Sequence, residues 1–423
     1  MKYIKLFEEW LAEKGQPFLF EGGAAGHMNH PYDDKQLTFG DFKRIIDAGL
    51  RGELHFDEQA TEKVDGQNLF VTVKDGNVLF ARNKGELKNP LTLKGIEDKF
   101  KNHPSATVKD TFNFAAEDLS KQLKRLSPSA QNKFFNNGKD FMNMEIVYSL
   151  NPNVINYDSD FIQFHGVQET DGNGNITGSN SKYAKDLVKI LKRIEAHYGD
   201  TFEIVPPKVI RLKRDEDFSK NKNKFINKIN KLQDQYKLKD SDPVMKYHEM
   251  WWTDLIDKEF SNLPDHLKIG LMLRWAYGDK KTLNMRKLSD HLSQEQIDKI
   301  KKFDKEDYKL KQKENIRPFE DLFLELGSVI IKNAYDYLTP NPSKEAQRLR
   351  SEISKEAKNI KRGDNIEQIK KVEDELARLQ RIGGIESIYP TEGIVFKYKD
   401  KIYKLTGTFA AINKLLGIIK YGR

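Results

Sequence analysis

The feature of this sequence that most constrains its fold is a residue pattern that changes twice along the chain. Strand-like alternation of apolar and polar residues runs from Gln59 to Leu87 and again from Asp140 to Val167. Residues from about 215 to 380 are highly charged and mostly helical in period, and strand-like alternation then returns in GIVFKYKDKIYKLTG, residues 393–407. We therefore expect an α+β fold in which a β-rich platform is interrupted by a long, mainly α-helical insertion.

Short motifs place individual elements within this frame. Asp75-Gly76 between two strand-like runs predicts a tight β-hairpin, because this pair readily adopts positive φ. TDGNGNITG at 170–178 predicts a second hairpin turn, and Asp400-Lys401 predicts a third. Apolar periodicity predicts helices over 1–13, Phe39–Leu50 and Phe409–Tyr421, and a helical hairpin over 344–380 that turns at 362–365. We expect one domain at 1–214 together with 381–423, and the insertion at 215–380.

Composition excludes several classes of protein. The chain has no cysteine, which rules out disulfide scaffolds, cysteine zinc sites and thiol nucleophiles. No apolar run reaches the roughly 18 residues that a membrane span needs, and the first residues lack the pattern of a signal peptide. The 72 basic and 64 acidic residues give a net charge of +8, which favours an anionic partner but is also common on ordinary surfaces. We expect a cytoplasmic protein that does not bind membranes and is a monomer.

A lysine before an Asp-Gly turn is the first candidate for chemistry. In TEKVDGQN, Lys63 precedes Asp65-Gly66 and the strand that follows, so the turn could present its amine at the edge of a sheet. Lysine is a nucleophile only when deprotonated and needs a perturbed environment for that role. The segment alone is equally consistent with a surface lysine beside a hairpin. The sequence contains no GxxxxGK[ST] loop, kinase-type glycine loop or HExxH motif.

Four further segments follow in a fixed order and change the balance between these interpretations. They are RNKG at 82–85, Glu145 in an otherwise apolar strand, DFIQFHG at 160–166, and EGIVFK at 392–397 with KIYKL at 401–405. The ordered set resembles the covalent nucleotidyltransferases, which comprise ATP-dependent DNA ligases, RNA ligases and mRNA capping enzymes. TEKVDGQN looks most like phage RNA ligases that seal nicks, and EGIVFK and KIYKL are similar to the family's fourth and fifth motifs. The resemblance covers about 63–167 and 386–407, under half of the chain.

The resemblance implies a fold and a reaction. The fold would be an antiparallel-sheet nucleotidyltransferase core of the ATP-grasp-like ligase type, with 215–380 as an insertion that could bind nucleic acid. Lys63 would attack the α-phosphate of ATP and form a lysyl-AMP phosphoramidate. AMP would pass to a 5′-phosphate, which a 3′-hydroxyl would then displace, as in RNA or DNA repair.

The resemblance also implies roles for individual residues. Glu62 would contact the adenine amino group, Arg82 would hold phosphate or ribose, and Glu145 would bind the ribose hydroxyls. Phe164 would stack on adenine, with Phe161 as the second choice, and His165 would be structural. Glu392 would position Mg²⁺ or Mn²⁺. The remaining residues expected at the nucleotide are Asp65, Asn68, Lys397 and Lys404, the last two neutralising the transferring phosphate.

Three departures from the family pattern leave alternatives open. Asp65 follows the DNA-ligase pattern where nick-sealing RNA ligases often carry histidine, and Thr406 stands where a second lysine is usual. Lys404 lies 19 residues before the C-terminus, so we expect no C-terminal OB domain, which favours an RNA ligase. The alternatives are a DNA or hybrid-duplex nick ligase, an adenylyltransferase with another acceptor, and a nucleic-acid-binding protein whose ligase site has decayed.

The insertion and the N-terminal loop hold further candidates. Residues 208–239 contain 11 basic and four acidic residues, and Lys224, Lys228 and Lys231 share one helical face. This face is either a surface that follows nucleic-acid phosphates, RNA in preference to DNA, or an ordinary solvated face. Tryptophans of the insertion would stack on bases or, more simply, form a core. His27 and His30 would contact substrate or bind a metal.

Overall fold

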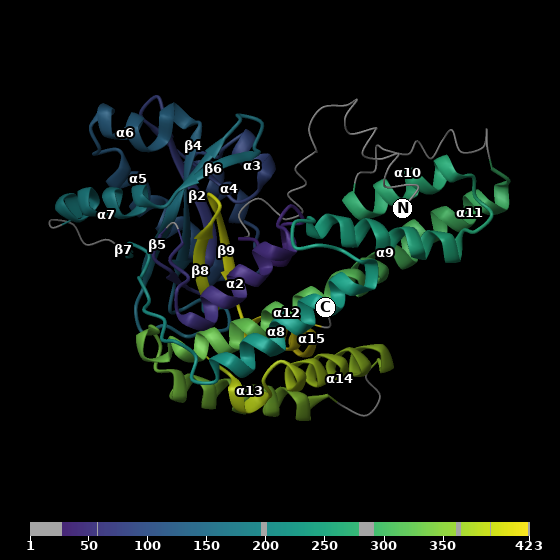
Figure 1. Ribbon diagram of the computed structural model, residues 1–423. Helices are drawn as coiled ribbons and strands as arrows, with labels where there is room; N and C mark the ends of the chain where they lie inside the picture. The colour runs from purple at the N-terminus through teal and green to yellow at the C-terminus, as the bar shows by residue number, and fades with distance from the viewer. Residues whose placement is uncertain are drawn as a thin grey trace. The chain divides into compact units, whose positions relative to one another are not determined.

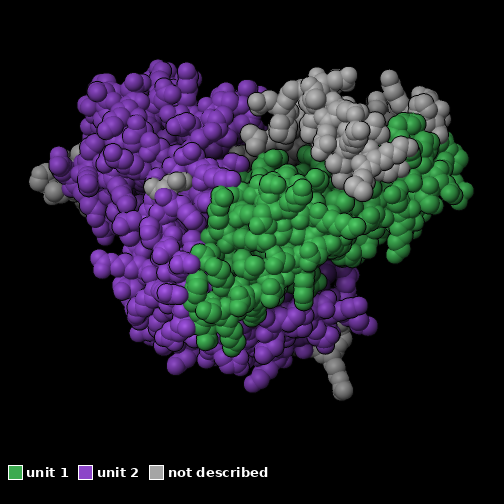
Figure 2. All heavy atoms as spheres, viewed as in Figure 1, with its two compact units in different colours: residues 1–22, 31–47, 217–323 green, residues 23–30, 48–216, 324–423 purple. Residues whose placement is uncertain are grey.

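The computed structural model describes residues 28–56, 58–195, 201–278, 292–360, 365–389 and 391–421. The helix predicted over 1–13, His27 and residues 361–364 of the predicted hairpin turn lie outside these ranges. The chain forms two compact units, coloured separately in Figure 2. In the described residues, unit 1 comprises 31–47, 217–278 and 292–323, and unit 2 comprises the remainder. None of the helices in these ranges is long and apolar enough to span a bilayer.

Two sheets form the centre of unit 2 (Figure 1). The larger sheet has the order β3-β2-β4-β5-β6, and β7 pairs in parallel with β5 at one end. The smaller sheet has the order β1-β8-β9, so a strand near residue 60 pairs with strands near residue 400. The strands are β1 (Thr61–Lys63), β2 (Gln67–Lys74), β3 (Asn77–Ala81), β4 (Asp140–Val147), β5 (Phe161–Thr170), β6 (Ile176–Asn180), β7 (Glu203–Val205), β8 (Gly393–Tyr398) and β9 (Lys401–Leu405). The α+β class with a mainly antiparallel sheet is therefore confirmed.

The predicted hairpin turns are present. Asp75 and Gly76, with φ of 50° and 75°, join β2 to β3, and residues 171–175 join β5 to β6. The third turn lies one residue earlier than predicted, because Lys399 and Asp400 adopt positive φ between β8 and β9. Local turn chemistry was thus a sound guide to strand pairing.

One face of the larger sheet is covered by helices that the sequence pattern did not reveal. These are α4 (Leu93–Phe100), α5 (Ala106–Leu123), α6 (Pro128–Phe135) and α7 (Lys182–Glu195), with the short α3 (Lys84–Lys88) at the end of β3. Ser105 and Ser127 begin α5 and α6 as N-caps that accept a backbone N–H. Their apolar sides and the sheet form one core, in which Leu69, Met144 and Phe164 are fully buried.

The predicted helical hairpin is present but belongs to unit 2. It consists of α13 (Pro342–Asn359) and α14 (Ile366–Arg381), and it forms a core with α15 (Thr408–Tyr421). The predicted insertion, 215–380, is therefore divided, because residues 324–380 cluster with the sheets. The boundary between the two units falls inside α12 (Tyr308–Asn333). The helical period of the sequence continues through this segment, so the sequence does not indicate where one unit ends and the other begins.

Unit 1 is helical. It contains η1 (Pro31–Asp33), most of α2 (Phe39–Arg51), α8 (Phe218–Tyr236), α9 (Val244–Glu259), α10 (Asp265–Tyr277), α11 (Gln294–Lys302), η4 (Phe303–Asp307) and the first part of α12. Trp252 and Trp275 are each 1% exposed and pack with Phe260 and Phe303. The simpler prediction, that these tryptophans form a core, is confirmed.

We expect Gly166→Ala to lower the free energy of unfolding by about 1–3 kcal/mol, because overpacked sites in a core cost this much. A Cβ at Gly166 would lie 2.9 Å from the Ser181 Cα and 3.1 Å from the Asn180 oxygen, both backbone atoms. Gly417→Ala in α15 is the matched control, since a Cβ there meets nothing within 4 Å. Urea unfolding of both variants measures the difference; equal stability would contradict the close approach at Gly166.

Candidate functional site

The register of the smaller sheet places a set of polar residues on one face. Lys63 pairs with Gly393, and Thr61 pairs with Val395, which in turn pairs with Lys404. Because side chains alternate along a strand, Thr61, Lys63, Lys404 and Lys397 share this face, and Thr406 continues the alternation just beyond β9. Glu62 lies on the opposite face.

Lys63 lies at the centre of a buried ionic cluster. Its side chain is 7% exposed, and its Nζ lies 3.3 Å from Glu145 Oε1 and 3.1 Å from Glu392 Oε2. Its third acceptor is the Val64 carbonyl at 3.1 Å, so three acceptors match the three N–H donors of the ammonium group. Burial alone would lower the pKa of Lys63, but Glu145 and Glu392 outweigh it and hold the pKa above its usual value. The amine is therefore protonated in this arrangement.

The two carboxylates extend the cluster on either side. The second oxygen of Glu145 lies 3.2 Å from His165 Nε2, and the second oxygen of Glu392 lies 3.9 Å from Lys404 Nζ. Burial would raise the pKa of Glu145, but Lys63 and His165 lower it to about 2. From Glu145 through Lys63 and Glu392 to Lys404, carboxylates and ammonium groups therefore alternate, a pattern that compensates the cost of burying each charge.

Gly66 explains why an Asp-Gly turn follows this lysine. A Cβ at Gly66 would lie 2.6 Å from the Ile146 oxygen and 2.7 Å from Glu145 Cγ. Glycine therefore lets β4 approach the turn closely enough for Glu145 to reach Lys63.

The register of β4 with β5 decides which aromatic ring of β5 faces this cluster. Gln163 pairs with Glu145 and Phe164 pairs with Met144, so alternation puts His165 on the Glu145 side of the strand and Phe164 on the other. The register then shifts between Asn143 and Met144, which leaves His165 unpaired between Phe164 and Gly166. His165 contacts Glu145, whereas Phe164 is fully buried in the core of the larger sheet. Phe164, which the resemblance would place against adenine, therefore faces the core in this structure.

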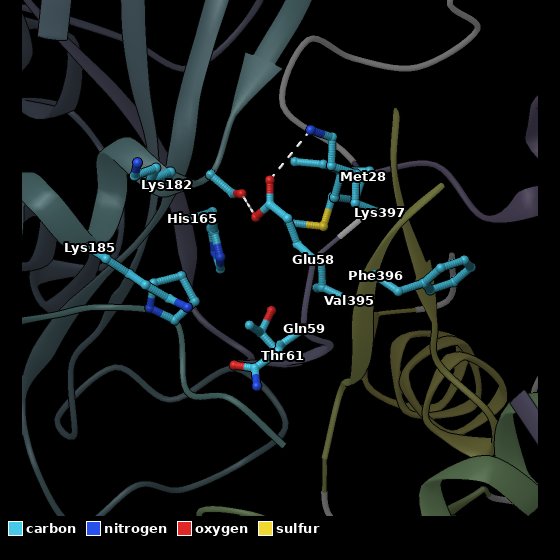
Figure 3. A pocket seen from close by; sticks show the side chains of 13 residues that line it. Met28, Glu58, Gln59, Thr61, His165, Lys182, Lys185, Val395, Phe396 and Lys397 are labelled. Atoms are coloured by element: carbon cyan, nitrogen blue, oxygen red, sulfur yellow. Dashed lines mark hydrogen bonds and ion pairs between the residues drawn. The ribbon is translucent and has the colours of Figure 1, made fainter. Parts of the chain in front are cut away.

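His165 also lines a cavity of about 320 Å³ between strands of the two sheets (Figure 3). Ligand pockets start at about this size. Thr61, Val395 and Ile402 line it from the smaller sheet, and Ser181, Lys182 and Lys185 line it from the start of α7. Thr61 and His165 are the functional candidates that sequence reasoning missed, although the alternation of Thr61 with Lys63 was a usable signal.

Two other predicted residues lie next to Glu145. Asn68 pairs with Glu145 across β2 and β4, and its amide donates to Asn143 Oδ1 at 2.7 Å. Arg82 donates to the Asn68 carbonyl and lies over the Phe112 ring at 4.2 Å. Burial lowers the pKa of Arg82, against the influence of Glu86 and Glu145. The structure thus brings Arg82 and Asn68 together with Lys63, Glu145, Glu392 and Lys404.

Glu62 and Asp65 are anchors of the fold. Glu62 is 1% exposed and accepts hydrogen bonds from the Thr339 amide at 3.1 Å and hydroxyl at 2.6 Å. Asp65 accepts from the amides of Val154 at 2.7 Å and Ile155 at 2.8 Å. Burial, with Glu392 nearby, raises the pKa of Asp65 to about 7. Neither carboxylate faces the cavity.

The remaining predicted residues lie away from the Lys63 cluster. Phe161 packs in a separate small core with Val64 and is 8% exposed. Lys397 lies four residues along β8 from Gly393, a separation of about 13 Å at strand geometry. Lys224, Lys228 and Lys231 are exposed on α8 of unit 1.

Thr406 has a buried hydroxyl that lacks a partner. Its side chain is 3% exposed, and Oγ1 makes no hydrogen bond within the described part of the chain. A buried hydroxyl without a partner is costly and calls for a water or a ligand. Because Thr406 lies opposite Gly393, which has no side chain, its hydroxyl is placed on the Lys63 side of the sheet.

The residues around Lys63 fit a metal ion only in part. In the ranges that the structure describes, no three histidine or carboxylate groups are arranged to hold an ion. Mg²⁺, however, usually takes one or two protein carboxylates and completes its shell with water and substrate phosphates. Glu392, beside Lys63, suits that partial role. His30 is buried near Lys404, and burial holds its pKa well below the usual value.

Comparisons of the chain with protein-family models, curated proteins and solved structures gave no match.

We expect Phe164→Leu to destabilise the fold by up to about 1.5 kcal/mol, as for near-isosteric core changes, and to leave the affinity for AMP unchanged. If the cavity takes the base of AMP, as the resemblance predicts for this site, His165→Ala should weaken AMP binding about tenfold, because loss of base stacking costs about 1–3 kcal/mol. Calorimetric titration with AMP and urea unfolding measure the two effects. Weaker binding for Phe164→Leu alone would contradict the assignment of His165.

Proposed function

We propose that this chain is an ATP-dependent polynucleotide ligase that forms a lysyl-AMP intermediate at Lys63 and acts preferentially on RNA. The observation that supports this most directly is the cluster of Lys63, Glu145, Glu392 and Lys404. Lys63, Glu145 and Lys404 come from β1, β4 and β9, Glu392 immediately precedes β8, and the sequence resemblance selects the same four. A buried lysine beside two carboxylates and a second cation suits covalent phosphoryl chemistry.

In the proposed first step, the Nζ of Lys63 attacks the α-phosphorus of ATP. A P–N bond forms as the bond from the α-phosphorus to the bridging oxygen breaks, and pyrophosphate leaves with the electron pair. Glu145, at 3.3 Å, is the carboxylate left to accept the ammonium proton if Glu392, at 3.1 Å, holds the metal. Lys404 would stabilise the negative charge on the transferring phosphate.

The ion pair between Lys63 and Glu392 must weaken for this step. Both carboxylates keep the pKa of Lys63 high, so the lysine is a poor nucleophile before ATP binds. Bound Mg²⁺ would supply positive charge that neutralises the phosphates, and Glu392 would hold it. Glu392 would then no longer be a full partner for Lys63, and the lysine could lose its proton more readily.

The cavity suits the base of the nucleotide. Thr61, His165 and Val395 line it on the same side of the smaller sheet as Lys63. We place adenine between the rings and methyl groups of His165 and Val395, with the Thr61 hydroxyl at its edge. In this proposal His165 and Thr61 take the roles that sequence reasoning gave to Phe164 and Glu62. The two sheets would then be the halves of a nucleotidyltransferase core.

Incubation with Mg²⁺ and ATP labelled at the α-phosphate tests the covalent step. We expect label on the denatured protein, and none on Lys63→Ala. Lys189→Ala is the matched control, because this exposed lysine of α7 does not line the cavity. Equal labelling of the Lys63→Ala protein, or no labelling of any, would overturn the mechanism and leave a nucleic-acid-binding protein as the alternative.

The labelled protein, freed of ATP, then identifies the acceptor. It is offered a duplex nicked in RNA, the same duplex nicked in DNA, and single strands with a 5′-phosphate. Sealing of the RNA nick is the expected result. Sealing of the DNA nick alone would make the preference for RNA wrong. If the label stays on the protein with every strand offered, an acceptor other than a polynucleotide would be favoured.

Thr406 provides a test that separates an active site from a decayed one. We expect Thr406→Val, which keeps the shape but removes the hydroxyl, to slow lysyl-AMP formation about 10- to 100-fold. Hydrogen bonds to charged groups contribute about 1.5–3 kcal/mol, which corresponds to this range. Thr406→Ser should retain most of the rate. A Thr406→Val protein as fast as the parent would show that the hydroxyl does not contact the phosphate.

A further inference from the structure

Three lysines line the cavity, and none of them belongs to the Lys63 cluster. They are Lys397 of β8 and Lys182 and Lys185 of α7. Lys397 lies about 13 Å along β8 from Gly393, the residue opposite Lys63, at strand geometry. Figure 3 shows Lys182 and Lys185 on one side of the cavity beside His165, and Lys397 on the opposite side, where it contacts Glu58. Sequence reasoning assigned no role to Lys182 or Lys185.

The position of Lys182 and Lys185 is unfavourable for the helix itself. Both lie in the first turn of α7, where the helix dipole is positive, and no acidic residue lies in that turn. A cation at this end costs about 0.3–1 kcal/mol in an exposed helix. Neither lysine has an ion-pair partner among the residues that the structure describes, and both are exposed. Departures from local preference without compensation are typical of binding sites.

One carboxylate already lines this cavity. Glu58, in the segment before β1, has one oxygen 3.4 Å from Lys397 Nζ, and its other oxygen accepts from the Ser181 hydroxyl. Ser181 immediately precedes α7, so Glu58 links β8 to the start of that helix across the cavity (Figure 3). Lys397 Nζ also lies 3.7 Å from Asp400 Oδ1, so three lysines stand against two carboxylates and leave a small excess of positive charge.

We propose that Lys182, Lys185 and Lys397 form a phosphate-binding site, and that the Glu58 carboxylate occupies it until a phosphate displaces it. The inference rests on the proposed function in that it places this site within the proposed nucleotide cavity. A phosphate carries more charge and more acceptor oxygens than a carboxylate, so it can compete with Glu58 for Lys397 and attract the flexible side chains of Lys182 and Lys185. Its source is either the polyphosphate of ATP or the backbone of the polynucleotide.

Binding of inorganic pyrophosphate to the full chain tests the site directly by calorimetry. The double variant Lys182→Gln, Lys185→Gln should bind about 3- to 10-fold more weakly, as expected from two partly exposed ion pairs. Glu58→Gln should bind about 2- to 5-fold more tightly, because a competing charge is removed. Lys189→Gln, on the same helix but away from the cavity, should bind as the parent does.

The double lysine variant and Glu58→Gln are expected to change the affinity for pyrophosphate in opposite directions, and this distinguishes a binding role from a structural one. A carboxylate that only supports the fold would weaken binding when neutralised, so weaker binding by Glu58→Gln overturns the proposal. Unchanged binding by the double lysine variant also overturns it. These titrations do not require formation of lysyl-AMP. They can therefore exclude the phosphate-binding site without excluding the ligase reaction, and the labelling experiment can exclude the ligase reaction without excluding the phosphate-binding site.

Two kinetic arms identify the source of the phosphate. In the first, the KM for ATP in lysyl-AMP formation is compared between the parent and the double lysine variant. In the second, preformed adenylylated protein transfers AMP to a 5′-phosphorylated strand at increasing strand concentration. If the double lysine variant has a higher KM for ATP, the site binds the polyphosphate of the nucleotide. If it has a higher KM for the strand, the site binds the backbone of the polynucleotide.

Discussion

The burial of Lys63 is the constraint on which the rest of unit 2 depends. An ammonium group with a side chain only 7% exposed is tolerable only where carboxylates compensate its charge. Glu145 and Glu392 meet this need from two different sheets, so the ion pairs fix how the sheets meet. Removing one partner of such a buried group costs about 3–5 kcal/mol, which makes the cluster a structural element as well as a chemical one.

This constraint accounts for the unusual connectivity. Glu392 immediately precedes β8, more than 300 residues after Lys63, and β8 must pair with β1 for the two side chains to meet. The chain between them is free to vary as long as it returns to this place. It forms α8 to α11 in unit 1 and then α13 and α14, which form a core with α15 in unit 2.

Charge is distributed differently in the Lys63 cluster and in the cavity. In the cluster, Lys63 and Lys404 are balanced by Glu145 and Glu392. In the cavity, Lys182, Lys185 and Lys397 outnumber Glu58 and the Asp400 carboxylate that also pairs with Lys397. A cluster with equal numbers of positive and negative groups suits proton transfer between them, whereas a site with more cations than carboxylates suits binding of an anion.

The sequence by itself determined the α+β class, the hairpins, the helical hairpin and the meeting of Lys63 with Glu145, Glu392 and Lys404. These follow from short-range patterns: turn residues, strand alternation, helical period and ordered motifs. Only the tertiary structure decided that His165 and not Phe164 faces the cavity, because the side of β5 that faces Glu145 depends on the register with β4. It alone placed Glu62 against Thr339, divided the insertion inside α12 and brought Lys182 and Lys397 to the same cavity. Each of these depends on contacts between residues far apart in sequence, which no local pattern encodes.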